Sequence, residues 1–456
     1  MCMKNYFLIL VLFCSCSLGF SQSFEGNWKG SLQVSGMELP LIFEFKYNGG
    51  WEGSMQSPKQ STNRFPLSSI TASGDSIYVE LKNMGVKYHG KIGSDRNEIH
   101  GTFQQGAMKT NLVLQRLTAD EASKEGTYKR SQRVNPPYSY DTVDVTFENS
   151  IDKVTLAGTI TKPKEPGKYP AVVLVSGSGP QDRNETLMGH EPFKVLSDYF
   201  TKNNIIVLRY DDRGVGKSTG NYSKATTGDF GKDVLAALGF LRKQAQVDPN
   251  KVGIIGHSEG GLIASILAGQ QTSGLNFIVT LAGPTIPMDS LMLLQNAAVM
   301  KSLGKTISPD ELAMIKRNYE IMASDLPSDQ AFDAIRNNLK SVNGSQNMEG
   351  ADQIGALVTP WFRHFIKIDP VPFIQKIKIP VFAAFGGKDI QVPATENMES
   401  LNKNLPKNKK DQLKIYPSFN HLFQNAKTGA VGEYSEIEET INSELMKDLA
   451  SWIKSL

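Results

Sequence analysis

Cysteine is nearly absent from this chain, and the three cysteines that it has lie at one end. They are Cys2, Cys14 and Cys16, so the chain beyond residue 16 can form neither a disulfide nor a thiolate metal site. A large excess of one sign of charge is missing as well: 49 Lys and Arg residues against 46 Asp and Glu residues give a net charge of +3, with no basic stripe of the kind that binds nucleic acid. The sequence also has no Cys/His metal spacing and no low-complexity tract. These absences predict a globular protein with no metal, no other cofactor and no nucleic-acid partner.

An apolar run long enough to span a membrane is also missing, although a shorter one begins the chain. Lys4 supplies a positive end, residues 6–18 an apolar core, and Gly19-Phe20-Ser21 a cleavage region of mostly small residues. This pattern predicts a signal peptide over residues 1–21, and a secreted or periplasmic protein with no stable membrane span after cleavage. Neither Cys14 nor Cys16 follows a convincing lipobox, so lipid anchoring is the second choice.

Residues 22–118 differ from the rest of the chain because short alternating apolar runs recur between Gly, Asn and Asp turn signals. This rhythm predicts a meandering antiparallel sheet, as a small sandwich or barrel, followed by a polar linker over residues 119–140. Trp28 and Trp51 leave two interpretations open. The domain is either a carbohydrate- or substrate-binding module, or a structural or oligomerisation domain whose tryptophans lie in the core. Aromatic side chains in short β domains usually pack inward, which favours the second.

Ser258 is the candidate nucleophile. It lies within Gly256-His257-Ser258-Glu259-Gly260, between an apolar strand at 251–255 and a helix-like stretch at 262–268. This is the G-x-S-x-G pattern in its informative context of strand, sharp turn and helix. Glycines flank the serine because the turn is strained and neighbouring backbones pass close by. The turn exposes the hydroxyl at the carboxyl end of a sheet, beside a helix N-terminus.

A serine nucleophile needs a base that is held by an acid, and in this architecture they follow in the chain order Ser, acid, His. The apolar strand 379–385 runs into Gly-Gly-Lys-Asp, which places Asp389 on the loop where the acid is required. The strand 413–416 precedes the loop that carries His421, and none of the other five histidines falls in this order. We therefore predict Asp389 as the acid and His421 as the base, with Asp289, after the preceding strand, as a rival acid.

An oxyanion hole requires two backbone N–H donors. One is expected from Glu259, directly after the nucleophile. The other is expected from the Ser-Gly-Ser-Gly loop that follows the apolar strand 171–175, where glycine lets the backbone approach a substrate. Either Ser178 or Gly179 could donate, and the sequence leaves that choice open.

Between residues 284 and 370 the alternation of strands and helices breaks, and helical patterns take over. Ser308-Pro-Asp-Glu311 is a capping-box start, and apolar residues then recur at helical spacing. An insertion at this point is expected to form a helical cap over the carboxyl edge of the sheet. Some of its apolar residues could line an acyl pocket or pack the cap's own core, and these alternatives stay open for Met292, Met300, Met314, Met322, Trp361 and Phe362.

Together these motifs resemble the bacterial esterases of the α/β-hydrolase superfamily, in the broad group that also holds the serine aminopeptidase-like hydrolases. The resemblance runs from about Tyr138 to the C-terminus. It is carried by residues 176–183, 209–218, 256–260, 360–362 and 387–389. It implies a mostly parallel, doubly wound α/β-hydrolase sheet over residues 141–456, with a helical cap at about 284–370, behind a small all-β domain. It also suggests a tight turn in which Asp212 and Arg213 brace neighbouring loops.

Three functions are compatible with these residues. The leading one is a secreted serine carboxylesterase that hydrolyses small or medium esters through an acyl-enzyme, using Ser258, His421 and Asp389. A serine aminopeptidase or amidase on the same fold is the alternative, although such relatives commonly have Trp after the nucleophile, where this chain has Glu259. A catalytically inert binding protein is the alternative of a different class, and the complete triad argues against it. The acyl and alcohol preference and the oligomeric state are not encoded in any recognisable motif.

Overall fold

The computed structural model describes residues 24–34, 37–58, 64–105, 108–124, 129–271, 274–343 and 358–456. The predicted signal peptide lies outside these residues, so secretion stays a prediction. In the described part of the chain, no helix is both long enough and apolar enough to cross a bilayer.

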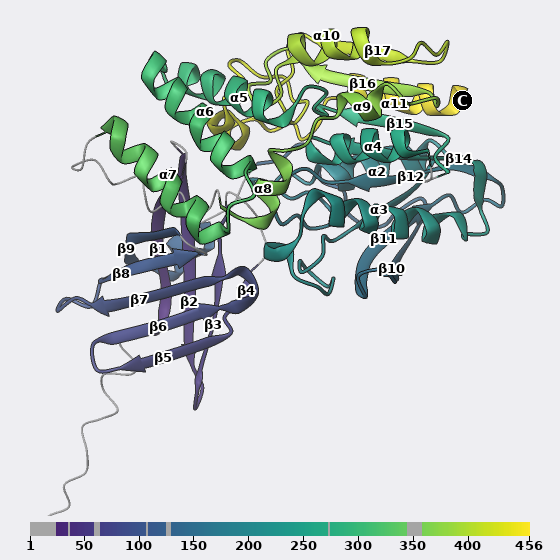
Figure 1. The fold of residues 1–456 in the computed structure, drawn as a ribbon. Coiled ribbons are helices and arrows are strands. Elements are labelled where there is room, and N and C mark those ends of the chain that lie inside the picture. The colour runs from purple at the N-terminus through teal and green to yellow at the C-terminus, as the bar shows by residue number, and fades with distance from the viewer. Residues whose placement is uncertain are drawn as a thin grey trace, which may run out of the picture.

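The N-terminal part is an antiparallel sheet that curls on itself, and Figure 1 shows it as a separate unit at one side of the molecule. The strand order is β4-β3-β2-β1-β9-β8-β7-β6-β5. The Leu67 N–H donates to the Gly53 carbonyl across 2.9 Å, which brings the start of β5 back to β3. We call this unit the barrel domain. Its strands are β1 (Gly26–Val34), β2 (Met37–Tyr47), β3 (Trp51–Gln56), β4 (Phe65–Pro66), β5 (Ser69–Ser73), β6 (Ser76–Leu81), β7 (Val86–Ile92), β8 (Glu98–Gln105) and β9 (Met108–Leu117).

Side chains fill the interior of the barrel domain. Trp28 is fully buried there and donates its indole N–H to the Phe24 carbonyl at 2.7 Å. Tyr88 is also fully buried, and its hydroxyl contacts the carbonyl oxygens of Ile99 and Leu112. Trp51 is half-buried and packs edge-on against Tyr47. Trp28 is therefore a core residue, and the packed interior favours a structural role for this domain over a ligand-binding one.

The second unit is an α/β domain built on one sheet, with the strand order β10-β11-β13-β12-β14-β15-β16-β17. The first two strands pair antiparallel, and all pairings from β13 to β17 are parallel. The predicted fold class is thereby confirmed. The strands are β10 (Asp141–Asn149), β11 (Val154–Lys162), β12 (Tyr169–Val175), β13 (Ile206–Tyr210), β14 (Val247–His257), β15 (Phe277–Leu281), β16 (Val381–Gly386) and β17 (Gln412–Tyr416).

The connections of this sheet fix where a site can form. After β12 the chain turns to β13 on one side, and after β14 it continues to β15 on the other side. The loops that leave β12 and β14 therefore part at a topological switch point, which is where open α/β sheets form their binding crevices. Helices cover both faces: α2 (Pro192–Lys202) packs with α11 (Ser443–Ser455), and α3 (Thr227–Arg242) packs with α4 (Glu259–Gln270). Helix α10 (Ala394–Asn404) lies beside β16 and β17.

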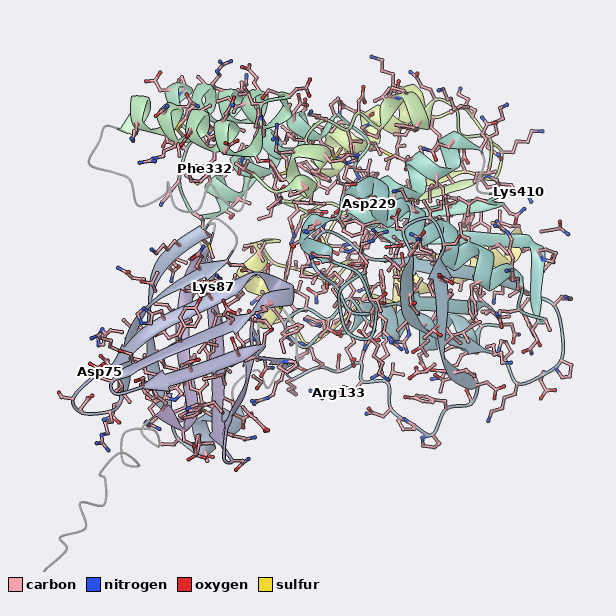
Figure 2. All side chains as sticks on the ribbon, turned by 60° about the horizontal axis from the view of Figure 1, so that its bottom comes forward. Asp75, Lys87, Arg133, Asp229, Phe332 and Lys410 are labelled. Atoms are coloured by element: carbon pink, nitrogen blue, oxygen red, sulfur yellow. The ribbon has the colours of Figure 1, made fainter. Side chains whose placement is uncertain are left out.

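The segment between β15 and β16 holds α5 (Met288–Ser302), α6 (Pro309–Ala323), α7 (Ser328–Asn343), α8 (Pro360–Phe365) and α9 (Val371–Ile374). Helix α6 begins with the predicted capping box, because Ser308 and Glu311 each accept the other's backbone N–H. Helices α6, α7 and α8 share a small apolar core of their own, which contains Met322 and Phe362. Figure 1 shows α5, α6 and α7 as a layer above the barrel domain, and Figure 2 labels Phe332 on this layer.

The connector between the two domains, predicted as a polar linker, is anchored to the α/β domain. After α1 (Ala119–Lys124), the buried Arg130 donates to the carbonyl oxygens of Met188, Ile437 and Ser435 in the α/β domain. Figure 2 places Arg133, a few residues further on, between the two units. The domains also meet where the short helix η2 (Lys82–Met84) of the barrel lies against η3 (Tyr222–Lys224).

Candidate active site

Ser258 occupies a strained turn between β14 and α4. Its φ of 52° and ψ of −118° lie in a region that residues with a side chain rarely adopt. A Cβ added to Gly256 would lie 2.1 Å from the Gly260 carbonyl oxygen, and one added to Gly260 would lie 2.1 Å from the Val175 carbonyl oxygen. Only glycine fits at these two positions, which is why the motif has the spacing G-x-S-x-G. Ser258 itself is half-buried at the carboxyl edge of the sheet.

Asp389 and His421 face each other at the ends of β16 and β17. His421 Nδ1 lies 2.7 Å from Asp389 Oδ2, and both side chains are buried. The other carboxylate oxygen, Oδ1, accepts the N–H groups of Gln391 at 2.7 Å and Val392 at 2.9 Å. These bonds fix the carboxylate, and the carboxylate in turn orients the imidazole. No residue in the described part of the chain hydrogen-bonds His421 Nε2, the nitrogen that would exchange a proton with a substrate.

Ser258 and His421 reach the same edge of the sheet, but no hydrogen bond joins them within the described residues. His257, the residue before Ser258, contacts the imidazole of His421, and the two ring centroids are 4.7 Å apart. Nucleophile and base contacts are often long before substrate binds and tighten in the reacting complex. The rival acid, Asp289, is exposed in the first turn of α5, where it accepts the backbone N–H and hydroxyl of Ser290. No hydrogen bond joins it to His421 within the described residues.

The loop after β12 passes close to the nucleophile. A Cβ added to Gly177 would lie 3.1 Å from the Ser258 Cβ. The Gly177 N–H donates to Glu185 Oε1 at 2.8 Å, and the Gly179 N–H donates to the Tyr222 hydroxyl at 2.9 Å. The Ser178 N–H has no acceptor among the described residues. Of the two donors that the sequence left open, Ser178 is therefore the one whose N–H is free to bind an oxyanion.

Glu259 follows the nucleophile, and its side chain has a position that sequence reasoning missed. The carboxylate is buried and accepts three neutral donors: the Ser178 hydroxyl at 2.8 Å, the Thr227 hydroxyl at 2.7 Å and the Trp361 indole N–H at 2.9 Å. Burial raises the pKa of Glu259, and these hydrogen bonds offset only part of that rise. The side chain thus ties the oxyanion loop, α3 and the cap helix α8 to the nucleophile turn.

The turn after β13 braces the same loops. Asp212 accepts the Ser176 hydroxyl at 3.0 Å and the Gln181 N–H at 3.0 Å, and burial raises its pKa well above the ordinary value. Arg213 forms ion pairs with Asp233 at 2.7 Å and with Asp152 at 2.9 Å. The suggested structural role of Asp212 and Arg213 agrees with these contacts.

The cap residues proposed for an acyl pocket fall into three groups. Met322 and Phe362 are buried in the core that the cap helices share. Met292 and Trp361 are half-buried and pack against both this core and the core of the α/β domain. Met300 and Met314 are half-buried on α5 and α6. Trp361 is the member of this set that reaches the catalytic edge, through its hydrogen bond to Glu259.

The candidate site has the chemical groups that a serine hydrolase needs, and comparison with known proteins identifies the family of the chain. Residues 191–427, more than half of the 456-residue chain, match the family described as serine aminopeptidase, S33. The chain therefore belongs to this family, and it is an enzyme of the serine α/β-hydrolase superfamily. The matched region contains Ser258, Asp389 and His421.

One curated protein and two solved structures illustrate what this chain is similar to. Esterase EstD of Thermotoga maritima is 24% identical over 376 residues, which cover 82% of this chain and 79% of that protein. Among solved structures, the esterase PF2001 of Pyrococcus furiosus is 18% identical with a TM-score of 0.41, over 72% of this chain and 98% of that one. The α/β-hydrolase GrgF from Penicillium is 15% identical with a TM-score of 0.44, over 69% of this chain and 98% of that one.

Proposed function

We propose that this enzyme is a serine carboxylesterase that hydrolyses small or medium esters, with Ser258, His421 and Asp389 as its triad. The observation that carries the proposal is the buried His421–Asp389 hydrogen bond at the edge of the sheet where the strained turn presents Ser258. Ser258 directly follows β14, and Asp389 and His421 lie on the loops after β16 and β17, so strands of one sheet position all three.

The reaction follows from this arrangement. Ser258 Oγ attacks the ester carbonyl carbon and passes its proton to His421 Nε2, while Asp389 stabilises the resulting imidazolium. The negative charge that develops on the carbonyl oxygen is received by the N–H groups of Glu259 and Ser178. Collapse of this intermediate breaks the carbon–oxygen bond to the alcohol, which leaves with the proton from His421. Water then attacks the acyl-enzyme with His421 again as base, which releases the acid and restores Ser258.

Ester hydrolysis is favoured over aminopeptidase activity by the state of Glu259. An aminopeptidase needs a carboxylate that can bind the ammonium group of its substrate. Glu259 lies next to the nucleophile, but hydroxyl and indole donors already occupy both of its oxygens, and it is 2% exposed. The similarity to a protein named as an esterase supports the same choice.

The test is hydrolysis of a panel of aryl esters of increasing acyl length beside aminoacyl amides of the same leaving group. We expect every active substrate to be an ester, and amides cleaved faster than all esters would overturn the proposal. Ser258→Ala should abolish labelling by a fluorophosphonate and lower kcat by about three to six orders of magnitude. Ser223→Ala, which changes an exposed serine on η3, is the matched control and should label normally.

We further propose that the enzyme is exported. The N-terminal pattern of Lys4, an apolar core and small residues up to Ser21 supports this. Expression with the native N-terminus followed by mass measurement of the mature chain tests it, and a chain that keeps residues 1–21 would contradict it.

A further inference from the structure

His257, the residue before the nucleophile, has a hydrogen-bond partner on each side of its ring. Its Nδ1 lies 2.8 Å from Glu185 Oε1, and its Nε2 lies 3.0 Å from the backbone carbonyl oxygen of His421. Both His257 and Glu185 are buried. The same Glu185 oxygen also accepts the Gly177 N–H at 2.8 Å.

These partners determine where the protons of His257 lie. A carbonyl oxygen can only accept, so Nε2 must carry a hydrogen. Glu185 Oε1 already accepts one N–H and, as a carboxylate oxygen, accepts a second one from Nδ1. His257 is then an imidazolium with both nitrogens protonated, paired with a carboxylate. Burial alone would lower the pKa of His257, but the charge of Glu185, their hydrogen bond, the His421 carbonyl and the nearby Asp389 together raise it.

The pair connects three loops that come from three different strands. Glu185 lies on the loop after β12 and fixes its start at Gly177, next to the proposed donor Ser178. His257 is the last residue of β14 and precedes Ser258. The carbonyl that it holds belongs to His421, on the loop after β17. One ion pair therefore contacts all three parts of the proposed catalytic machinery.

The loop that supplies Glu185 is built to hold it in place. Glu185 has a φ of 53°, in the left-handed region that residues with a side chain avoid. Asp182 Oδ1 stabilises this turn by accepting the N–H groups of Asn184 at 2.9 Å and Thr186 at 3.1 Å. The space beside the ion pair is lined mainly by apolar side chains, among them Phe193 and Leu196. These apolar side chains and the burial of both residues keep bulk water from the charge pair.

We propose that Glu185 and His257 form a charged clamp that sets the positions of the oxyanion loop, the nucleophile turn and the loop carrying the base. His257 and Glu185 are positioning residues in this proposal, which rests on the proposed hydrolase mechanism. A neutral group at position 185 removes the charge that favours a doubly protonated His257. With glutamine there, a singly protonated His257 has one N–H and cannot donate both to the amide oxygen and to the His421 carbonyl.

The protonation state can be read directly on the wild-type enzyme. In protein labelled with ¹⁵N-histidine, we expect both ring nitrogens of His257 to carry a proton at pH 7 to 8, with imidazolium shifts. The signal is assigned by its loss in His257→Gln. A single protonated nitrogen at a pH where the enzyme is active would overturn the clamp. Because this measurement needs no turnover, it separates failure of the clamp from failure of the ester hydrolase proposal.

Kinetics test the positioning role. We expect Glu185→Gln and His257→Gln each to lower kcat by about 10- to 100-fold, with KM changed by less than about threefold, because misplaced donors weaken transition-state binding more than ground-state binding. The double variant should cost no more than the worse single variant, since the pair acts as one unit. Glu191→Gln and His100→Gln alter a half-buried carboxylate at the start of α2 and an exposed histidine of the barrel, and they should leave kcat unchanged.

Two outcomes would contradict the positioning role. Full kcat in a folded Glu185→Gln enzyme would show that the charge of the clamp is unnecessary. Additive losses in the double variant would show that the two residues act separately. If His257→Gln does not fold, Glu185→Gln and the wild-type ¹⁵N measurement still decide the matter.

Discussion

Three buried carboxyl groups surround Ser258, and their partners give each a different role. Asp389 faces the imidazole of His421 and is held by two backbone N–H groups. Glu185 faces the imidazole of His257. Glu259 has only neutral donors, so burial dominates and raises its pKa. Residue type alone does not separate these groups, but the neighbouring donor does: an imidazole partner suits stabilisation of a positive charge, and neutral hydroxyl and indole partners suit a structural bridge.

The acid assignment can be tested with two matched substitutions. Asp389→Asn keeps the size of the side chain but removes the charge that orients and stabilises His421, so we expect kcat to fall by about three to four orders of magnitude. Asp289→Asn changes an exposed residue of α5 and should leave kcat within about twofold of wild type, the size of change typical of a surface substitution. Initial rates with one aryl ester measure both. An inactive Asp289→Asn beside an active Asp389→Asn would mean that the acid lies after β15.

His190 should make the enzyme sensitive to acid. It is fully buried between the Tyr434 carbonyl and the Thr440 hydroxyl, and burial lowers its pKa from 6.5 to about 4. Between pH 6.5 and about 4, His190 is therefore protonated in the unfolded chain but not in the folded chain. Above pH 6.5 this histidine does not reduce the free energy of unfolding. As the pH falls from 6.5 to about 4, it lowers the free energy of unfolding by a total of about 3 kcal/mol.

Urea unfolding at pH 7 and pH 4.5 measures this effect. Wild type should lose about 2 kcal/mol more over this interval than His190→Gln, even if the variant is less stable at pH 7. His100→Gln, at an exposed position of β8, should follow the wild-type dependence. An equal loss in wild type and His190→Gln would assign the acid sensitivity to other groups.

At the scale of elements, the cap meets the catalytic edge through helix α8. Trp361 stacks on Phe365 with ring centroids 5.1 Å apart, and its indole N–H reaches both oxygens of Glu259. This contact brings the cap to the residue next to the proposed nucleophile, so we expect the orientation of α8 to affect the space for an acyl group. Met292 of α5 packs at the same junction of the two cores.

Trp361→Phe isolates the hydrogen bond, because it removes the N–H donor but keeps an aromatic ring. A bond to a charged acceptor contributes about 1.5–3 kcal/mol, so α8 should become less fixed. We expect KM to rise several-fold for long-chain esters and less for acetate esters, with kcat reduced by less than about fivefold. Trp452→Phe removes a comparable indole bond, to the Lys410 carbonyl, far from the site and is the control. Equal KM changes for short and long esters would show that α8 does not shape the acyl pocket.

The positions of the proposed triad could be predicted because their signals are local. An apolar run followed by Gly, Ser or Asp predicts a strand and its loop, and parallel strands bring such loops to one edge. The partners of buried polar side chains carry no such signal. Glu185 and His257 are 72 residues apart in the sequence, and Arg130 and Ile437 are 307 apart. Their pairing depends on tertiary packing, so neither the clamp nor the anchored connector could be read from one sequence.

At the scale of the whole molecule, the barrel domain lies beside the catalytic unit, and none of its described residues belongs to the proposed site. Among its described elements, η2 contacts η3, which carries Tyr222. Tyr222 is held within the α/β domain by stacking on Phe230 at 5.3 Å and by the Gly179 N–H. The oxyanion loop should therefore keep its support when the barrel is removed.

Two truncations that differ by four residues separate the barrel from the connector. A chain that begins at Lys129 keeps Arg130 and its bonds to carbonyl oxygens of the α/β domain, whereas one that begins at Arg133 loses them. Each buried carbonyl left without its donor costs about 1–3 kcal/mol, so the shorter chain should unfold at a clearly lower temperature. Thermal unfolding of the two proteins side by side measures the difference, and equal midpoints would show that Arg130 is dispensable.

The longer of the two truncated chains, which starts at Lys129, tests whether the barrel takes part in catalysis. All residues of the proposed triad, oxyanion hole and clamp lie after β12 begins, so the chain that starts at Lys129 should hydrolyse a small soluble ester within about tenfold of the full-length rate. A tenfold loss corresponds to about 1.4 kcal/mol in the barrier, which allows for a looser η3 once η2 is gone. Size-exclusion chromatography and the unfolding midpoint establish that the truncated chain is folded. If it is folded and soluble but inactive, the barrel must contribute to the site through η2, and its role as a purely structural domain would have to be abandoned.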